Sequence, residues 1–316
     1  MKSINKKRLK YLIPIFILII VSISMLIWVF NYNKKIQDDV NVVNEIREQV
    51  VSVETPDIVD TRDDVDKEPI YTMKDADEKD IVSKGSFDST DTDTSTDTDT
   101  EINLGIDPNL VRKIDFDKLL SINTDATRWL YIPNTNIDSY VMQERNVGEY
   151  FYGWRDIYGY GNSTGSYFAP AIPYNLEDAH LLILGHRMNN GAMFGNLPGY
   201  YNDVSSAYNY PCAYIYYPDH SERWRIWAAI DAPSDDLIYA VPYTLGSEDY
   251  KNLLEHIYDI SRYYFDENPD EWTPTLFLST CNQWTDGTWN RFLAGYVYEC
   301  SYDYKTHEVS YFESNY

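Results

Sequence analysis

The stretch Thr275-Leu-Phe-Leu-Ser-Thr-Cys281 begins as a short apolar run and ends at a thiol. Such a run, bounded by polar residues, is typical of a buried strand. A polar, turn-rich segment follows Cys281, and a second apolar run extends from Phe292 to Tyr298. If the two runs are antiparallel neighbours, Arg291 returns beside Cys281. A thiol at a strand end is held rigidly yet can reach solvent, and a guanidinium beside it favours thiolate and stabilises an oxyanion.

Six further short apolar or aromatic runs lie upstream, separated by turn residues; they are 129–132, 137–142, 165–168, 180–184, 212–217 and 224–230. Helical patterns are fewer. One begins after Asp107-Pro108, and one covers about Ser247 to Tyr264, where Ser247 can cap the helix and acids fill the first turn. Many short strands with few helices predict a mainly β fold, a barrel or a sandwich with helices attached.

His186 follows the run Leu181 to Leu184 after the permissive Gly185. Two strand ends can bring an imidazole and a thiol into one cleft, so His186 and Cys281 are a candidate catalytic pair. The other two cysteines, Cys212 and Cys300, sit inside strand-like runs, where cysteine usually behaves as a small hydrophobe. Three cysteines cannot all pair with one another, which argues against a disulfide scaffold.

Three segments resemble those of the class B sortases. The run Leu184-Gly-His-Arg-Met-Asn-Asn-Gly-Ala-Met-Phe-Gly-Asn-Leu197 is similar to their histidine segment, close to GHxMxxGxMFGxL. Leu278-Ser-Thr-Cys281, with Arg291 ten residues later, is similar to their LSTC…R segment, and Gly165-Ser-Tyr-Phe168 to their GSxF element. The resemblance covers about 110–300.

The resemblance implies an eight-stranded β-barrel with added N-terminal helices and one helix before the cysteine strand. It implies a cysteine transpeptidase of Gram-positive cell envelopes, in which Cys281 is the nucleophile, His186 the general acid and base, and Arg291 holds the substrate or the oxyanion. Ser279 and Thr280 are expected to line a pocket for the substrate threonine. The expected partners are secreted proteins with an NPxTx-like C-terminal sorting signal and an amine from peptidoglycan or from a pilin lysine.

Two departures leave the sorting motif open. The family often places an Asp shortly after GSxF, whereas this chain continues Ala169-Pro-Ala-Ile-Pro. Asn-Gln-Trp follows Cys281 in place of the acidic or aromatic pair that the resemblance leads us to expect. The alternatives are a cysteine peptidase of the cell wall and a non-catalytic adhesion module in which Cys281 is structural. A papain-like peptidase usually places its Cys before its His, at the start of a helix, which is the reverse of the order here.

The N-terminal part divides by charge. Residues 1–10 form a basic tail, and residues 11–30 carry no charge, which is long enough for a transmembrane helix. The bases before this run place the N-terminus in the cytoplasm and the rest outside. A cleaved signal peptide is the competing interpretation, although the run is longer than usual and no small-residue cleavage site follows.

Residues 31–107 are strongly acidic and include an Asp-Thr repeat from Asp88 to Glu101, so we expect a disordered spacer, with a short helix possible from Val40 to Val53. Residues 108–316 are the expected catalytic domain. The 316-residue chain has a net charge of -24, which argues against nucleic-acid binding. The histidines are scattered, and no calcium-loop spacing occurs in the repeat, so we expect no metal and no cofactor.

Overall fold

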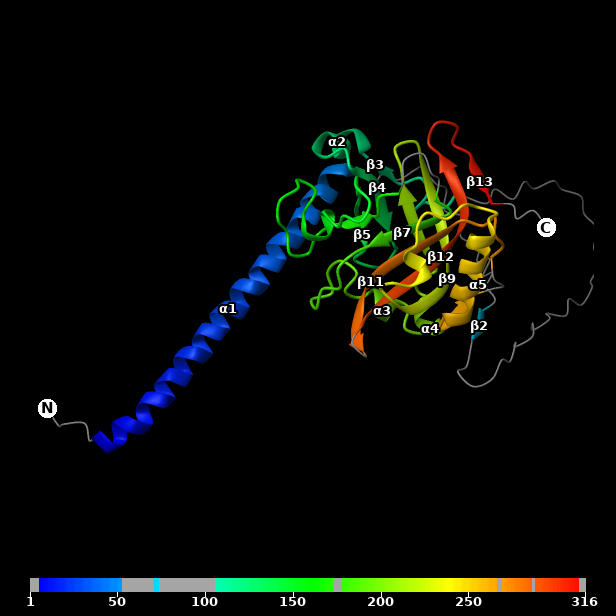
Figure 1. The fold of residues 1–316 in the computed structure, drawn as a ribbon. Helices are drawn as coiled ribbons and strands as arrows, with labels where there is room; N and C mark the ends of the chain where they lie inside the picture. The colour runs from blue at the N-terminus through cyan, green and yellow to red at the C-terminus, as the bar shows by residue number, and fades with distance from the viewer. Residues whose placement is uncertain are drawn as a thin grey trace, which may run out of the picture.

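The computed structural model describes residues 6–52, 71–73, 106–172, 178–265, 269–285 and 288–312. Its centre is a closed barrel of eight strands, in the order β12–β11–β7–β6–β5–β4–β8–β9, with β9 pairing back to β12 (Figure 1). The pairs β5–β6 and β7–β11 are parallel, and the other neighbours are antiparallel. The strands are β4 Ala126–Tyr131, β5 Asp138–Gln143, β6 Tyr167–Ala169, β7 His180–Leu184, β8 Cys212–Tyr216, β9 His220–Pro233, β11 Thr275–Thr285 and β12 Thr288–Asp303. Each of the eight overlaps one of the predicted apolar runs, and the expected eight-stranded barrel is confirmed.

Short strands extend the barrel at its edges. β13 (Val309–Tyr311) pairs with β12, β10 (Tyr263–Phe265) with β9, and β2 (Tyr71–Met73) with β10. Outside the barrel sheet, β1 (Val51–Ser52) pairs with β3 (Lys113–Ile114). The helices are α1 Lys6–Val50, α2 Phe116–Ile122, α3 Leu197–Tyr200, α4 Val204–Ala207 and α5 Glu248–Ile260, with 3₁₀ turns η1 Tyr152–Trp154 and η2 Leu237–Tyr239.

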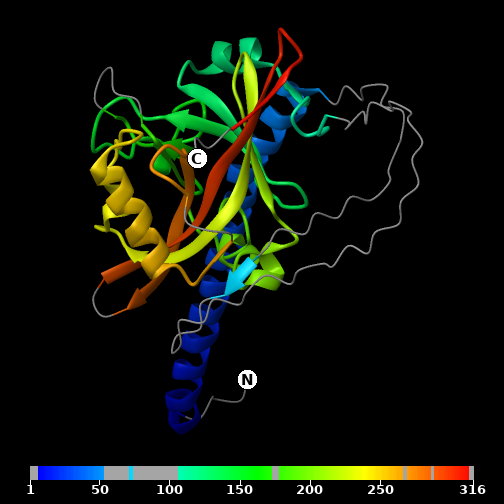
Figure 2. The ribbon, with the colours of Figure 1, turned by 90° about the vertical axis from the view of Figure 1, so that its right-hand side faces the viewer.

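Alternate residues of the barrel strands pack into two hydrophobic clusters, because successive side chains point to opposite faces of a sheet. The first cluster joins all the longer strands and holds Leu130, Val141, Ile183, Ile215, Leu278 and Phe292. The second takes the alternate positions, such as Trp129, Met142, Leu182, Phe277 and Leu293, and adds residues of α1, α2 and α5. Figure 2 shows α5 on the outside of the barrel. The first cluster is therefore the barrel interior, and the second lies between the barrel and its helices.

The helix before the cysteine strand forms as predicted at its start. Ser247 is the N-cap, and its hydroxyl accepts a hydrogen bond from the Tyr250 amide at 3.1 Å. Leu253, Leu254 and Ile257 are buried against the barrel. The helix ends at Ile260, four residues before the predicted Tyr264, because the chain turns extended at Ser261 and continues as β10.

The first helix of the folded domain begins later than predicted. Asp107 starts a single turn, in which the Leu110 amide donates to its carbonyl. Residues 113–114 then pair as β3 with β1, the short strand that directly follows α1, and α2 begins at Phe116. Asp115 caps this helix by accepting from the Lys118 amide at 2.9 Å. Because residues 113–114 form backbone hydrogen bonds with β1, they cannot belong to the helix that the sequence pattern predicted here.

The long N-terminal helix continues through residues that we expected to be a spacer. α1 extends to Val50, so the expected disordered segment is wrong for residues 31–50, and the helix considered from Val40 is part of α1. Ile36, Val43, Ile46 and Val50 are buried, and their spacing forms one helical face that packs on the domain. The Asp-Thr repeat lies outside the described residues.

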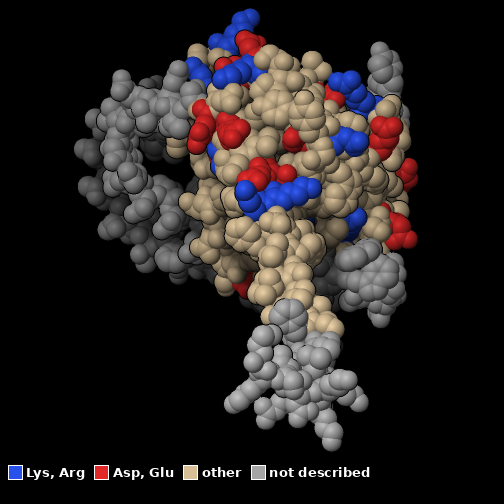
Figure 3. Space-filling model, turned by 90° about the vertical axis from the view of Figure 1, so that its left-hand side faces the viewer, with Lys and Arg blue, Asp and Glu red and all other residues tan. Residues whose placement is uncertain are grey.

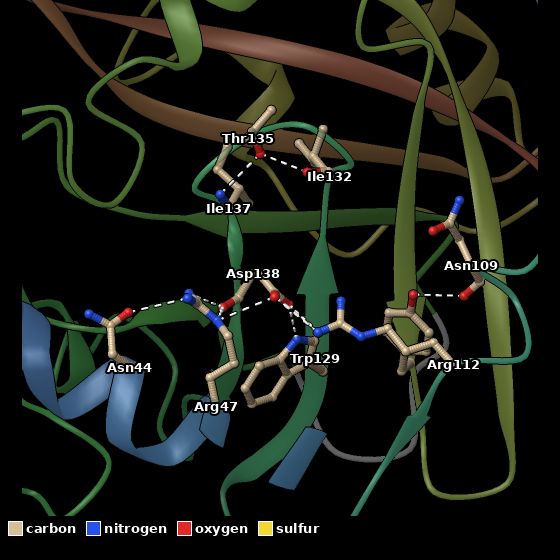
Figure 4. A network of polar contacts seen from close by, with 10 residues as sticks. Asn44, Arg47, Asn109, Arg112, Trp129, Ile132, Thr135, Ile137 and Asp138 are labelled. Atoms are coloured by element: carbon tan, nitrogen blue, oxygen red, sulfur yellow. Dashed lines mark hydrogen bonds and ion pairs between the residues drawn. The ribbon is translucent and has the colours of Figure 1, made fainter. Parts of the chain in front are cut away.

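An arginine of α1 fixes this helix to the barrel (Figure 4). Arg47 donates from Nε and Nη2 to the Asp138 carbonyl oxygen at 2.8 and 2.6 Å. The Asp138 carboxylate at the start of β5 also accepts from Trp129 Nε1 at 2.7 Å and from Arg112 Nη2 at 2.9 Å. The C-terminal third of α1, which we define as residues 36–50, is thereby part of the folded domain.

Candidate active site

The predicted thiol and guanidinium lie opposite each other on two neighbouring strands. β11 and β12 pair antiparallel, and Cys281 is opposite Arg291, after which the register shifts before Trp284. Arg291 Nη1 donates to Cys281 Sγ at 2.6 Å, and both residues are half-buried. The antiparallel return predicted from the ten-residue spacing is therefore present. A charged donor at this distance stabilises negative charge on the sulfur.

His186 lies at the same end of the barrel, on the strand beside the cysteine strand. β7 pairs parallel with β11 with Leu184 opposite Ser279, and the Gly185 amide donates to the Ser279 carbonyl at 3.1 Å. His186 comes two residues after Leu184, and Cys281 comes two residues after Ser279. The two residues therefore hold matching positions beyond the Leu184–Ser279 pair. A Cβ on Gly185 would be 2.7 Å from the rings of Phe194 and Tyr167, which is why a glycine precedes the histidine.

The three side chains share one face of the barrel. The second hydrophobic cluster, which lies between the barrel and its helices, includes Leu182 and Leu184 of β7, Phe277 of β11 and Leu293 of β12. Continuing the strand alternation from these residues places His186, Cys281 and Arg291 on the same outer face. The register and the alternation together bring an imidazole, a thiol and a guanidinium to one edge of the barrel surface.

The imidazole of His186 has two close contacts from the connection between β5 and β6. Its Nε2 lies 2.6 Å from the Gly153 carbonyl oxygen, and its ring centroid is 4.4 Å from that of Trp154. A carbonyl oxygen only accepts, so Nε2 carries a hydrogen, and in the neutral ring Nδ1 holds the lone pair. Burial lowers the pKa of His186 below its usual value, the Gly153 carbonyl partly opposes this, and the Arg291 charge lowers it further.

Gly153 and Trp154 were missed by the sequence analysis. The aromatic run from Tyr150 to Trp154 is visible in the sequence, and it precedes the GSxF element. Nothing in its spacing places it against a histidine more than thirty residues away, because only the closure of the barrel brings the two segments together.

Ser279 and Thr280 are buried, and their hydroxyls are used within the protein. Thr280 Oγ1 donates to the Gly185 carbonyl at 2.8 Å, which ties β11 to β7 next to His186. Ser279 Oγ and the Tyr239 hydroxyl are 2.7 Å apart. These contacts position the strand ends, and they do not show either hydroxyl lining a threonine pocket, so that assignment stays a prediction.

The other candidate residues serve the core. His180 is fully buried between the Thr275 hydroxyl and the Ile238 carbonyl, and burial lowers its pKa to about 4. Burial raises the pKa of the Cys212 thiol to about 12 and that of Cys300 to about 11. Both lie in strands, as expected of small hydrophobes. In the described part of the chain, no group of three His, Cys, Asp or Glu side chains could hold a metal ion.

A cavity of about 460 Å³ lies at the other end of the same strands. Its lining includes Asp178, Leu181 and Pro274, which lie just before or near the starts of β7 and β11. His186 instead follows the end of β7, and Cys281 lies in the later half of β11. The cavity is therefore separate from the three polar side chains.

Comparison with known proteins identifies the fold. No family model matches the chain, and no curated protein matches it in sequence. The structure is similar to that of Clostridium perfringens sortase B, with a TM-score of 0.52 and 20% identity over 58% of this chain and 98% of that one. It is also similar to a Staphylococcus aureus sortase B–substrate complex (TM-score 0.51, 20% identity, 58% and 84% covered) and to B. anthracis sortase B in complex with AAEK1 (TM-score 0.50, 22% identity, 60% and 86% covered). With its closed eight-stranded barrel and added helices, the chain has the fold of the class B sortases.

Proposed function

We propose that the chain is a membrane-anchored cysteine transpeptidase of the sortase type. The observation that carries the proposal is the 2.6 Å contact between Arg291 Nη1 and Cys281 Sγ, with His186 at the matching end of the next strand. Nucleophilic catalysis by a thiol requires an activated sulfur, a proton carrier and a donor for developing negative charge. The three side chains supply these functions on the fold of the class B sortases.

The proposed reaction exchanges one peptide bond for another. The Cys281 thiolate attacks the threonine carbonyl of an NPxTx-like sorting signal, and Arg291 stabilises the negative charge that develops on oxygen. The peptide bond breaks, the downstream peptide leaves with a proton from His186, and a thioester remains on Cys281. An amine of peptidoglycan or of a pilin lysine then attacks the thioester, the new amide bond forms as the C–S bond breaks, His186 takes the proton of the amine, and Cys281 is released as the thiolate. Thr280 supports this site by tying β11 to the end of β7, and Ser279 ties β11 to Tyr239 of η2.

The N-terminal helix supports the proposed location. Of the described residues, only those of α1 form a helix long and apolar enough to cross a membrane. From Ile17 to Phe30 its large apolar side chains are exposed, and no charged side chain appears on this part of the helix in Figure 3. We propose that residues 11–30 anchor the chain, with the basic residues 1–10 in the cytoplasm and the catalytic domain, residues 108–316, outside the cell.

A peptide assay on the full chain in lipid nanodiscs tests the proposal. We expect cleavage of NPxTx-type peptides after threonine, faster with an added amine, and a peptide–amine product with the mass of the transfer product. Cleavage that an amine does not change would indicate a hydrolase. If the wild-type chain turned over no sorting peptide, and Cys281→Ala gave the same result as the wild type, the outcome would support a binding module and contradict the proposal.

A further inference from the structure

The C-terminal third of α1 is joined to the catalytic histidine by a continuous set of contacts. We propose that this helix positions His186, acting through the loop of residues 144–166, and that Asp39 and Trp154 are its positioning residues. This inference rests on the proposed function, because the position of His186 matters for turnover only if His186 moves protons in the transfer. Figure 1 shows the segment between β5 and β6 beside the part of α1 that meets the domain.

The first contact is between the loop and the imidazole. The Gly153 carbonyl oxygen, 2.6 Å from Nε2, fixes which nitrogen carries the hydrogen. The Trp154 ring, 4.4 Å away and inclined by 54°, covers the imidazole and limits its rotation. Trp154 itself is 61% exposed, so most of its surface is not held by a core. Its position therefore depends on the backbone of the loop.

The second contact is between the two arms of the loop. The Asn162 amide donates to the Trp154 carbonyl at 3.0 Å, and the Ser166 amide donates to the Tyr152 carbonyl at 2.9 Å. Gly165 has a φ of +60°, and a Cβ at this position would lie 2.3 Å from the Gly153 carbonyl oxygen. The returning arm thus packs directly behind the carbonyl that binds His186.

The third contact is between the returning arm and α1. The Asp39 carboxylate accepts from the Ser163 amide at 2.9 Å and from the Ser163 hydroxyl, and the Asp39 carbonyl accepts from Asn162 Nδ2 at 3.3 Å. Asn162 is 5% exposed, and its Oδ1 accepts from the Thr164 and Gly165 amides at 2.8 and 3.1 Å. Asp39 therefore holds a segment whose own turn is already fixed.

The helix supplies a fixed position for Asp39. Ile36 and Val43 are buried on either side of it along the helix, and Arg47 binds the Asp138 carbonyl two turns further on. The turn around Tyr152 has a second support, because the Tyr152 amide donates to Glu144 at 2.8 Å and its hydroxyl to Asp125 at 2.6 Å. Loss of the Asp39 contacts should therefore displace the loop without unfolding it.

The test compares variants of the full chain in nanodiscs by steady-state transfer kinetics. We expect Asp39→Ala and Trp154→Ala each to lower kcat by about tenfold with little change in KM, since small misplacements of a catalytic group are costly. The double variant should be no slower than the slower single variant, because both act through the same loop. Trp154→Phe, which keeps a ring over the imidazole, should recover most of the rate. Asp38→Ala removes the same charge from an exposed neighbouring position and is the matched control.

Two further measurements separate this inference from the proposed function. Ser163→Ala breaks the same contact from the loop side and leaves α1 unchanged. Nitrogen NMR of the five histidines, with the His186 signal assigned by its loss in His186→Gln, reports the imidazole tautomer without any turnover. A wild-type chain without transfer activity would reject the proposed function, and the tautomer would still test the positioning. The inference would be overturned if Asp39→Ala and Ser163→Ala both had the same kcat and the same His186 signal as the control Asp38→Ala.

Discussion

At the scale of single residues, the site depends on a guanidinium that is planar and permanently charged. Arg291 Nη1 donates to the Cys281 sulfur, and the two residues lie opposite each other on paired strands. The spacing of ten residues was enough to predict this pair, because a short connection between two strands leaves few ways for them to pair. The neighbours of His186 come from distant sequence and could not be predicted in this way.

Arg291→Ala should lower kcat/KM for transfer by about 10²–10³, the usual effect of removing one oxyanion donor. Arg291→Lys should recover only part of this loss, because an ammonium lacks the planar fork. Arg262→Ala is the control, since Arg262 pairs with Asp231 on a neighbouring strand. Steady-state kinetics with one peptide and one amine measure all three variants. Near-normal transfer by Arg291→Ala would remove this residue from the mechanism.

His180 should make stability depend on pH. Its pKa is about 4 in the folded protein, against an ordinary value of 6.5, because burial disfavours the charged ring. Between these values the unfolded chain takes up a proton that the folded protein does not, so the free energy of unfolding falls as the pH decreases from 6.5 to 4. The loss from this residue is about 3 kcal/mol. Denaturant unfolding at several pH values should show a flatter dependence for His180→Phe, and an unchanged slope would contradict the prediction.

At the scale of elements, the paired strands β11 and β12 need a glycine where they pass closest to an aromatic ring. Gly295 is opposite Phe277, and a Cβ on Gly295 would lie 2.4 Å from that ring. The element boundaries show which signals are local. The Ser247 cap predicted the start of α5, whereas the start of α2 was missed because residues 113–114 pair with β1, which directly follows α1. The spacing of apolar residues that predicts a helix contains no information about pairing with a strand far along the chain.

Gly295→Ala should lower the free energy of unfolding by about 1–3 kcal/mol, because the added methyl group overpacks the ring of Phe277. The double variant Gly295→Ala/Phe277→Leu should lose less than the sum of the two single variants, since the smaller side chain makes room. Gly199→Ala is the control, because a Cβ there meets nothing within 4 Å. Chemical unfolding followed by circular dichroism measures these differences, and strictly additive losses would reject the steric explanation.

At the scale of the whole molecule, the N-terminal helix and the barrel form one folded unit. The apolar run from residue 11 to residue 30 predicted a helix long enough for a membrane, but the same helix continues to Val50 and packs on the domain. The acidic residues of 36–50 made this segment look like a solvated spacer. An average composition does not show that Ile36, Val43 and Ile46 are buried on one side of a helix. The spacing of those positions was the signal that could have revealed it.

Arg47→Ala should lower the free energy of unfolding by about 1.5–3 kcal/mol, the range for hydrogen bonds that involve a charged group. In this variant the Asp138 carbonyl loses the two hydrogen bonds that it accepts from Nε and Nη2 of Arg47. Arg145→Ala is the control, because the Arg145 side chain is 65% exposed in its ion pair with Asp125, and exposed pairs contribute about 0–1 kcal/mol. Unfolding of the full chain in detergent measures both. Equal effects of the two substitutions would show that α1 adds nothing to domain stability through Arg47.

The sequence by itself determined the eight strand segments, the helix capped by Ser247, the apolar N-terminal span and the thiol, imidazole and guanidinium of the candidate site. The strands, the helix and the span follow from periodicity, capping and composition, which act between residues close along the chain. The three candidate site residues follow from the short spacing between Cys281 and Arg291 and from the resemblance of the segments that carry them. Only the tertiary structure decided that β9 closes on β12, that α1 packs on the barrel and that Gly153 and Trp154 contact His186. Those contacts join residues tens of positions apart, and their free energy exists only once the barrel has closed and water has left the surfaces between them.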